Sequence, residues 1–224
     1  VGSYLLLSFL SFMPGVFLFF FKNVENIQED SLKEGNIRNL KSIVLQPRFL
    51  QAITAAAFAY AVMSFLMTAT PLSMHVMENM SLKETGLVLQ FHVVAMFLPS
   101  LITGNLIKKY GHSAIIYGGV LFFFITVLLS LFEQTYLNYM LSLIFLGLGW
   151  NFLFISGTSL VVLTYNKEEK FKVQGINDLI VFSTMALASL SAGILLNSIG
   201  WKMMNLICLP FLISVSYTHL RAHE

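Results

Sequence analysis

Charged residues are scarce in this sequence, and their scarcity excludes an ordinary soluble domain. They make up 11% of the 224 residues, whereas hydrophobic residues make up 57%. A soluble domain carries about a quarter charged residues. With a mean hydropathy of +0.78, the chain has too few polar side chains to cover a water-facing surface. The composition therefore predicts a protein whose solvent is the lipid bilayer.

Cysteine and catalytic motifs are also nearly absent. Cys208, the single cysteine, lies in an apolar run, which excludes an internal disulfide and a cysteine-based metal site. An intramembrane enzyme would need a nucleophile with a base, or paired acids. The sequence has no Gly-x-Ser-Gly or His-Glu-x-x-His motif, and only one carboxylate lies within a long apolar segment. We therefore expect no enzyme activity, no cofactor and no nucleic-acid partner.

Seven apolar segments are candidates to cross a bilayer, which takes about 20 helical residues. They are Tyr4–Phe21, Phe49–Met74, Gly86–Ile107, Ala114–Phe132, Tyr136–Tyr165, Gly175–Ile199 and Met203–Ser216. The last segment has only 14 residues. Such a helix rises about 21 Å, short of a hydrocarbon core of about 30 Å. The sequence thus predicts an all-α, polytopic membrane helical bundle.

Lysine and arginine are unevenly distributed among the loops between these segments. Alternate loops hold ten of them on one side and two on the other. The richer loops are residues 22–48, 108–113 and 166–174. Because cytoplasmic loops carry an excess of basic residues, we expect these loops on the inner side of the cytoplasmic membrane. The polar segment 22–48 is expected to be a solvated cytoplasmic connector.

Neither end of the sequence is expected to be a natural terminus. The chain begins with Val1 rather than Met, and residues 217–224 resemble a translated adapter sequence. We therefore expect a fragment of a longer protein with a non-native tail. His219 and His223, in that tail, are assigned no function.

One sequence frame occurs twice, 89 residues apart. Ser100–Gly111 and Ser189–Gly200 share a Gly-x6-Gly spacing at the end of a long apolar segment. Under the predicted orientation the first copy runs inward and the second runs outward. Similar segments in opposite directions form an inverted repeat, here with three helices in each unit. The frame therefore predicts a 3+3 architecture.

The first copy resembles the loop motif of the major facilitator superfamily. Gly104, Leu106, Lys109 and Gly111 match the pattern of that motif, whereas Lys108 stands where an aspartate is usual. Four further stretches are similar to one bacterial permease subgroup, some members of which are called riboflavin transporters. These stretches are residues 46–49, 67–72, 147–151 and 173–178.

The resemblance implies both an architecture and a function. Residues 1–21 would be the sixth transmembrane helix of an N-terminal half, residues 22–48 the central cytoplasmic loop, and residues 49–216 the C-terminal six-helix domain. The implied function is ion- or proton-coupled transport of a small organic solute by alternating access. The partners would then be the solute, the lipid bilayer and the missing N-terminal half of the same polypeptide. A channel or a non-transporting membrane scaffold is the alternative.

Polar residues at membrane depth are costly and therefore mark candidate sites. The resemblance places the segments that begin at residues 49, 86, 136 and 175 around the transport path. Asn151 is the foremost substrate-binding candidate; alternatively, its amide bonds a neighbouring helix. His92 is either a proton relay or a satisfied helix-interface residue. Gln90, nearer the outer surface, is expected to line the entrance.

Other residues are candidates for a cavity wall, a gate or close packing. Tyr60 and Met67 suit the wall of a cavity for a flat aromatic substrate, although helix packing explains them equally well. Asp178, together with the loop-motif residues, is expected to form a gate by pairing with a basic residue of the N-terminal half. Alternatively, Asp178 is a surface charge favoured by a helix N-terminus. Six small residues are expected to allow close helix approach: Gly147, Gly149, Gly157, Ala188, Ala192 and Gly193.

Overall fold

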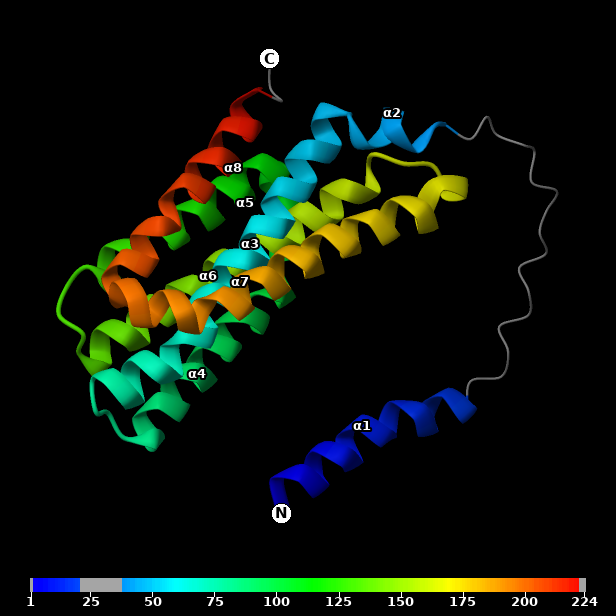
Figure 1. The fold of residues 1–224 in the computed structure, drawn as a ribbon. Coiled ribbons are helices and arrows are strands. Elements are labelled where there is room, and N and C mark those ends of the chain that lie inside the picture. Colours follow the sequence, from blue (N-terminus) through cyan, green and yellow to red (C-terminus); the bar gives the residue numbers. More distant parts are fainter. Residues whose placement is uncertain (1, 21–37, 222–224) are drawn as a thin grey trace. The chain divides into compact units, whose positions relative to one another are not determined.

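The computed structural model describes residues 2–20 and 38–221, which belong to two separate units (Figure 1). The first unit contains the helix α1 (Gly2–Phe20), with Pro14 in its interior. Large apolar side chains such as Leu5 and Phe12 are exposed along α1. A helix that is apolar all round suits a lipid environment.

All regular elements in the described part of the second unit are helices. Its elements are α2 (Leu40–Val44), α3 (Pro47–Pro71), the π-helical η1 (Leu72–Met77), α4 (Leu82–Phe97), α5 (Ser100–Ser130), α6 (Tyr136–Val162), the short η2 (Lys167–Glu169), α7 (Lys170–Ile207) and α8 (Leu209–Arg221). By length and composition, four stretches among the described residues are suited to cross a membrane: Pro47–Met77, Ser100–Ser130, Tyr136–Val162 and Lys167–Thr218. The predicted all-α membrane bundle is confirmed.

Local sequence signals explain where the helices begin. Pro47 opens α3 at a position where its missing N–H removes no helix hydrogen bond. Ser81 and Glu84 form a capping box at the start of α4. At the start of α6 the backbone N–H of Asn138 donates to the hydroxyl of Thr135. These caps satisfy backbone N–H groups that have no partner within the helix.

The predicted span Gly86–Ile107 is not one regular helix. α4 ends at Phe97, and α5 begins at Ser100 after an interruption at Leu98 and Pro99. Proline has no N–H to donate to the preceding turn, so the regular hydrogen bonding stops there. The span therefore consists of α4 and the first part of α5.

The last span is longer than the sequence predicted. Residues 201–207 are helical, and after a turn at Cys208 the helix α8 continues to Arg221. Together they reach the length of about 20 residues that a crossing needs, which corrects the predicted shortfall. Residues 217–221 of the predicted tail continue α8, whereas residues 222–224 lie outside the described residues. A non-native origin of this tail stays a prediction.

The two repeat glycines share one unusual backbone conformation. Gly111 has φ 82° and ψ 163°, and Gly200 has φ 75° and ψ 172°. Each interrupts a helix that otherwise continues, and no other glycine among the described residues has a positive φ. This region of backbone space is essentially restricted to glycine. The same turn therefore recurs at both copies of the frame, which supports the predicted repeat.

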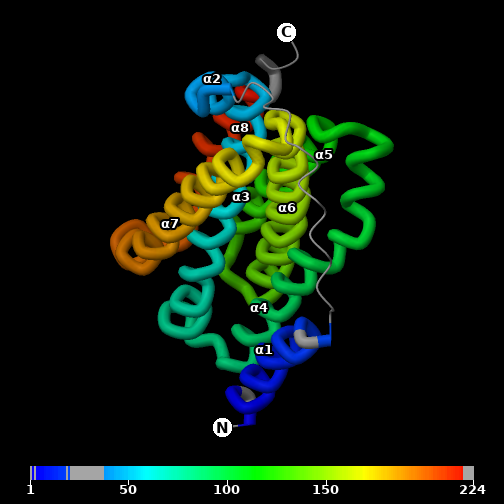
Figure 2. The backbone as a smooth tube through the Cα atoms, turned by 90° about the vertical axis from the view of Figure 1, so that its right-hand side faces the viewer, coloured from blue at the N-terminus to red at the C-terminus, as the bar shows by residue number. Residues whose placement is uncertain are grey.

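α6 is the central helix of the second unit. It packs against α3, α4 and α5, and Figure 2 shows it between α3 and α5. A Cβ at Gly157 would lie 2.8 Å from the carbonyl oxygen of Ala52 on α3, and one at Gly147 would lie 2.7 Å from a backbone carbonyl of α4. Gly149 likewise leaves no room for a Cβ. The predicted close approach is confirmed at these three glycines but not at Gly193, where a Cβ would make one ordinary contact.

The loops of the second unit gather at two opposite ends (Figure 1). The start of α3, the turn at Gly111 and the end of α6 line one cavity at the first end. The end of α5, the start of α6 and Trp201 lie together at the second end. Two of the predicted basic loops thus meet at the first end.

An ion pair ties the third basic loop to the same end. The guanidinium of Arg38 donates from Nη2 to Oε2 of Glu169 at 2.6 Å and from Nε to Oε1 at 3.0 Å. It also donates to the carbonyl oxygen of Thr164 after α6. Hydrogen bonds from Arg38 and from the backbone N–H of Asn166 lower the pKa of Glu169 to about 2, so this carboxylate is ionised at neutral pH.

The predicted solvated connector, residues 22–48, is thus anchored at Arg38 rather than solvated throughout. Its residues 22–37 lie outside the described residues.

Candidate functional site

Five aromatic side chains from four helices form a contact network, which we call the aromatic cluster. Its members are Tyr60 on α3, Phe97 on α4, Trp150 and Phe154 on α6, and Phe182 on α7. Trp150 and Phe154 are one helical turn apart and stack with ring centroids 5.0 Å apart and an interplanar angle of 15°. The ring of Tyr60 meets both of them edge-on, at 5.3 Å and 4.9 Å. Offset stacking and edge-on contact are the favoured arrangements of aromatic pairs.

The aromatic cluster has a buried centre and an open rim. Trp150 is only 4% exposed, whereas Phe97 is 59% and Phe182 50% exposed. The rim therefore presents aromatic surface on which another flat ring can stack. At the centre, the indole N–H of Trp150 has no hydrogen-bond partner among the described residues. A buried donor without a partner costs about 1–3 kcal/mol. A ligand that placed an acceptor atom at Nε1 would remove this cost, and its binding free energy would be more favourable by a similar amount.

Asn151 lies next to this cluster but points into the helix packing. Its Oδ1 accepts a hydrogen bond from the hydroxyl of Thr103 at 2.6 Å. Its Nδ2 donates to the carbonyl oxygen of Met96 and to the hydroxyl oxygen of Ser100, both at 2.7 Å. The side chain is fully buried. These contacts join α6 to the residues on both sides of the interruption between α4 and α5. They agree with the alternative that Asn151 bonds a neighbouring helix. Direct contact of Asn151 with substrate stays a prediction.

His92 also lies between helices, at the contact of α4 with α6. Its Nδ1 donates to the carbonyl oxygen of Leu143 at 2.7 Å, and its side chain is fully buried. Nε2 has no partner among the described residues. The ring is therefore anchored on one side and open to a further bond on the other, while a proton-relay role stays a prediction.

The remaining wall candidates are distributed along two helices. Tyr60 belongs to the aromatic cluster. Met67, about two helical turns farther along α3, is half-buried against the main core. Gln90 is exposed on α4. The structure therefore brings Tyr60 together with the aromatic cluster but does not bring Gln90 or Met67 into it.

The predicted gate residues lie at the first end of the second unit. Lys108 and Lys109 are exposed just before the turn at Gly111, and Lys109 lies over the ring of Tyr110 at 4.9 Å. Asp178 is exposed near the start of α7 and accepts a hydrogen bond from Nδ2 of Asn177 at 3.1 Å. No basic side chain among the described residues pairs with Asp178.

Two other gate candidates are part of the helix before the turn. Leu106 is half-buried, and a Cβ at Gly104 would meet no heavy atom within 4 Å. Packing among the described residues therefore does not require glycine at position 104.

Sequence reasoning missed four members of the aromatic cluster: Phe97, Trp150, Phe154 and Phe182. Aromatic residues make up 14% of this chain, so a single one carries little information. The spacing of Trp150 and Phe154 was a usable signal, since residues four apart lie on one face of a helix.

Comparison with known proteins places the chain among membrane transporters. A sequence profile described as Major Facilitator Superfamily matches residues 53–221. The chain is 36% identical over 214 residues to "Riboflavin transporter RfnT" of Brucella anthropi, an alignment that covers 96% of this chain and 54% of that protein. It is 26% identical to "Uncharacterized MFS-type transporter YdeG" of Bacillus subtilis, over 92% of this chain and 50% of that protein. The chain thus spans about half the length of these relatives.

Proposed function

Because the chain belongs to the Major Facilitator Superfamily of membrane transporters, we propose that it forms the C-terminal six-helix half of a secondary active transporter for a flat aromatic solute of the riboflavin class. The observation that carries this proposal is the aromatic cluster with its open rim. Its members come from all four segments that the family resemblance places around the transport path. If the aromatic cluster only packed two helices together, its members would come from two of these segments and not from all four.

The chemistry of the aromatic cluster matches such a solute. A fused heteroaromatic ring stacks on Phe97 or Phe182 at the rim and approaches Trp150 at the centre. Aromatic pairs contribute about 0.5–1.5 kcal/mol beyond the area that they bury. The indole N–H can donate to a ring carbonyl or ring nitrogen of the solute. Such a hydrogen bond would fix the orientation of the solute against a largely apolar wall.

Asp178 and the loop motif are assigned to gating in this proposal. Asp178 is exposed near the start of α7 and has no basic partner among the described residues, so it is available to a second half of the transporter. Lys108 and Lys109 lie at the same end of the unit. Transport by alternating access would make and break contacts at this end, coupled to a proton or another ion.

The proposed location is the cytoplasmic membrane, with the first end of the second unit facing the cytoplasm. The loops at this end, with residues 22–48, hold ten lysines and arginines against two in the other loops. Such an excess marks the cytoplasmic side.

Uptake of labelled riboflavin into proteoliposomes tests the substrate proposal. The complete protein that contains this chain is compared with its Trp150→Ala and Trp150→Phe variants. We expect Trp150→Ala to lower kcat/KM for uptake about tenfold or more, because about 1.4 kcal/mol of stacking or hydrogen bonding corresponds to a factor of ten. Trp150→Phe keeps a ring but removes the N–H, so its loss should be smaller.

Phe145→Leu is the matched control, because Phe145 lies on the same helix and contacts Phe122 outside the aromatic cluster. It should transport like the unmodified protein. Wild-type uptake by a folded Trp150→Ala variant would remove the aromatic cluster from the substrate path. Ion conductance without saturable uptake would instead favour a channel.

A further inference from the structure

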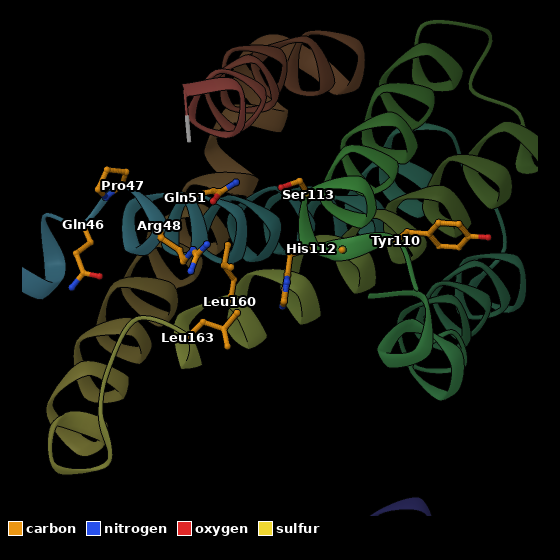
Figure 3. Close-up of a pocket in the computed structure, with 10 residues that line it drawn as sticks. Gln46, Pro47, Arg48, Gln51, Tyr110, His112, Ser113, Leu160 and Leu163 are labelled. Atoms are coloured by element: carbon orange, nitrogen blue, oxygen red, sulfur yellow. The ribbon is translucent and has the colours of Figure 1, made fainter. Parts of the chain in front are cut away.

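A cavity of about 590 Å³ lies at the first end of the second unit, away from the aromatic cluster. It is lined by the first turn of α3, by the turn at Gly111 and by the end of α6. Figure 3 shows the side chains of Arg48 and His112 reaching into the same region, next to Leu160. The cavity therefore has basic and polar groups on one wall and leucine side chains on another.

The charge of this cavity is not neutralised by the described part of the chain. Arg48 lines the cavity, whereas no aspartate or glutamate does. The ion pair found among the described residues joins Arg38 to Glu169, so Arg48 has no carboxylate partner there. An arginine without a counter-charge offers planar, bidentate hydrogen bonding to an oxyanion.

The start of α3 adds backbone donors to the same cavity. α3 is a helix of 25 residues, and its N-cap residue Gln46 makes no side-chain capping hydrogen bond. Pro47 has no N–H and the N–H of Leu50 donates to Gln46, so the N–H groups of Arg48 and Phe49 are the ones without a partner within the helix. The helix dipole places partial positive charge at this end. Such an end binds phosphate and related anions when other donors surround it.

Gln51 is an independent sign that the cavity holds a ligand. This residue is only 5% exposed and lines the cavity one turn into α3. Its side-chain amide makes no hydrogen bond with any of the described residues. Neither amide atom is among the fully buried side-chain atoms without a partner, so the amide faces the open space of the cavity, where a ligand can reach it. An oxygen of a bound anion would accept the bond that the amide N–H now lacks.

We infer that this cavity is a binding site for a phosphate group, held by Arg48, Gln51 and the N-terminal N–H groups of α3. A phosphate matches these donors because it presents several acceptor oxygens and negative charge to one small region. Two sources supply such a group: the headgroup of an anionic phospholipid in the adjoining leaflet, and a soluble phosphate. The leucine wall fits the glycerol part of a lipid, and the open polar side admits a soluble ion.

Binding measurements on the purified complete protein test this site without a transport assay. Isothermal titration with inorganic phosphate measures the soluble source, and native mass spectrometry with phosphatidylglycerol measures the lipid source. We expect Arg48→Gln to weaken binding of the preferred source about tenfold or more, because it removes a charge-assisted pair of hydrogen bonds. Gln51→Glu should weaken it as well, because it places a negative charge in the cavity. Phosphatidylglycerol adducts that persist in excess phosphate would identify the lipid, and displacement by phosphate would identify the soluble ion.

Lys202→Gln is the control, since Lys202 is an exposed basic residue beside Trp201 at the second end. It should leave binding unchanged. Equal affinities of Arg48→Gln, Gln51→Glu and the unmodified protein, or an equal loss in Lys202→Gln, would overturn the inference. Absence of binding by both probes to the unmodified protein would overturn it too. Because the readout is binding alone, neither result bears on riboflavin uptake.

Discussion

At Gly157 the backbone of α6 lies directly against the backbone of α3. A Cβ there would be 2.8 Å from the carbonyl oxygen of Ala52 and 2.9 Å from the backbone nitrogen of Ala56. Backbone atoms cannot move aside as the end of a flexible side chain can. The contact between these two helices therefore depends on the absence of one methyl group.

Gly157→Ala should destabilise the folded protein by about 1–3 kcal/mol, the usual cost of overpacking. Gly86→Ala is the matched control, because a Cβ at this helical position would meet no heavy atom within 4 Å. It should be neutral or slightly stabilising, since alanine favours the helix by up to about 1 kcal/mol. Thermal unfolding of both variants in the same detergent makes the comparison. Equal stability of the two would show that α3 and α6 separate easily.

Single residues were the hardest features to predict from the sequence. The choice of Asn151 and His92 as unusual buried polar residues was sound, but the sequence could not show which neighbour each one bonds. Thr103 and Leu143, their partners, are 48 and 51 residues away in the chain. Such long-range pairing depends on how helices pack, which periodicity does not contain.

The two turns that interrupt α5 and α7 have the same backbone conformation. Gly111 and Gly200 each interrupt a helix with φ near 80° and an extended ψ. A Cβ at either position would meet no heavy atom within 4 Å. The requirement for glycine there is therefore conformational and not a matter of space.

Gly111→Ala and Gly200→Ala should each destabilise the protein by about 1–3 kcal/mol, the cost of holding an L-residue in this backbone region. Gly104→Ala separates this effect from simple loss of glycine, since position 104 is helical and equally open. Denaturant titration of the three variants would measure the differences. If Gly104→Ala were as harmful as the other two, the conformational explanation would be wrong.

The helices themselves were largely readable from the sequence, because long apolar runs between polar loops carry a strong signal. The boundaries were less readable. The π-helical turn η1 after Pro71 and the interruption before Ser100 depend on backbone hydrogen bonds that composition does not reveal. The end of α8 was missed because residues 217–221 look polar, although the helix continues through them.

The whole second unit has a basic end and an opposite end with few basic residues. The turn at Gly111 and the loop after α6 lie at the first end, and Lys202 lies at the second. The sequence predicted this distribution from alternating loops alone. This distribution predicts the direction of insertion because basic loops stay on the cytoplasmic side.

Cysteine labelling tests the direction of insertion. Lys83, in the first turn of α4, and Lys172, in the first turn of α7, are exposed and are predicted to face opposite sides of the membrane. In intact cells, a membrane-impermeant maleimide should label a Lys83→Cys variant of the complete protein, and a Lys172→Cys variant only after permeabilisation. Cys208 is 2% exposed and should contribute little background. The reverse labelling pattern would show that the proposed orientation is wrong.

The turns at Gly111 and Gly200 also limit how the gene can change. Every single-base substitution in a glycine codon that alters the amino acid introduces a side chain with a Cβ, and this backbone region disfavours all of them. Any single-base change that replaces either glycine by another residue is therefore expected to strain the backbone. The two glycines, 89 residues apart, therefore tolerate without strain only changes that leave the encoded amino acid the same.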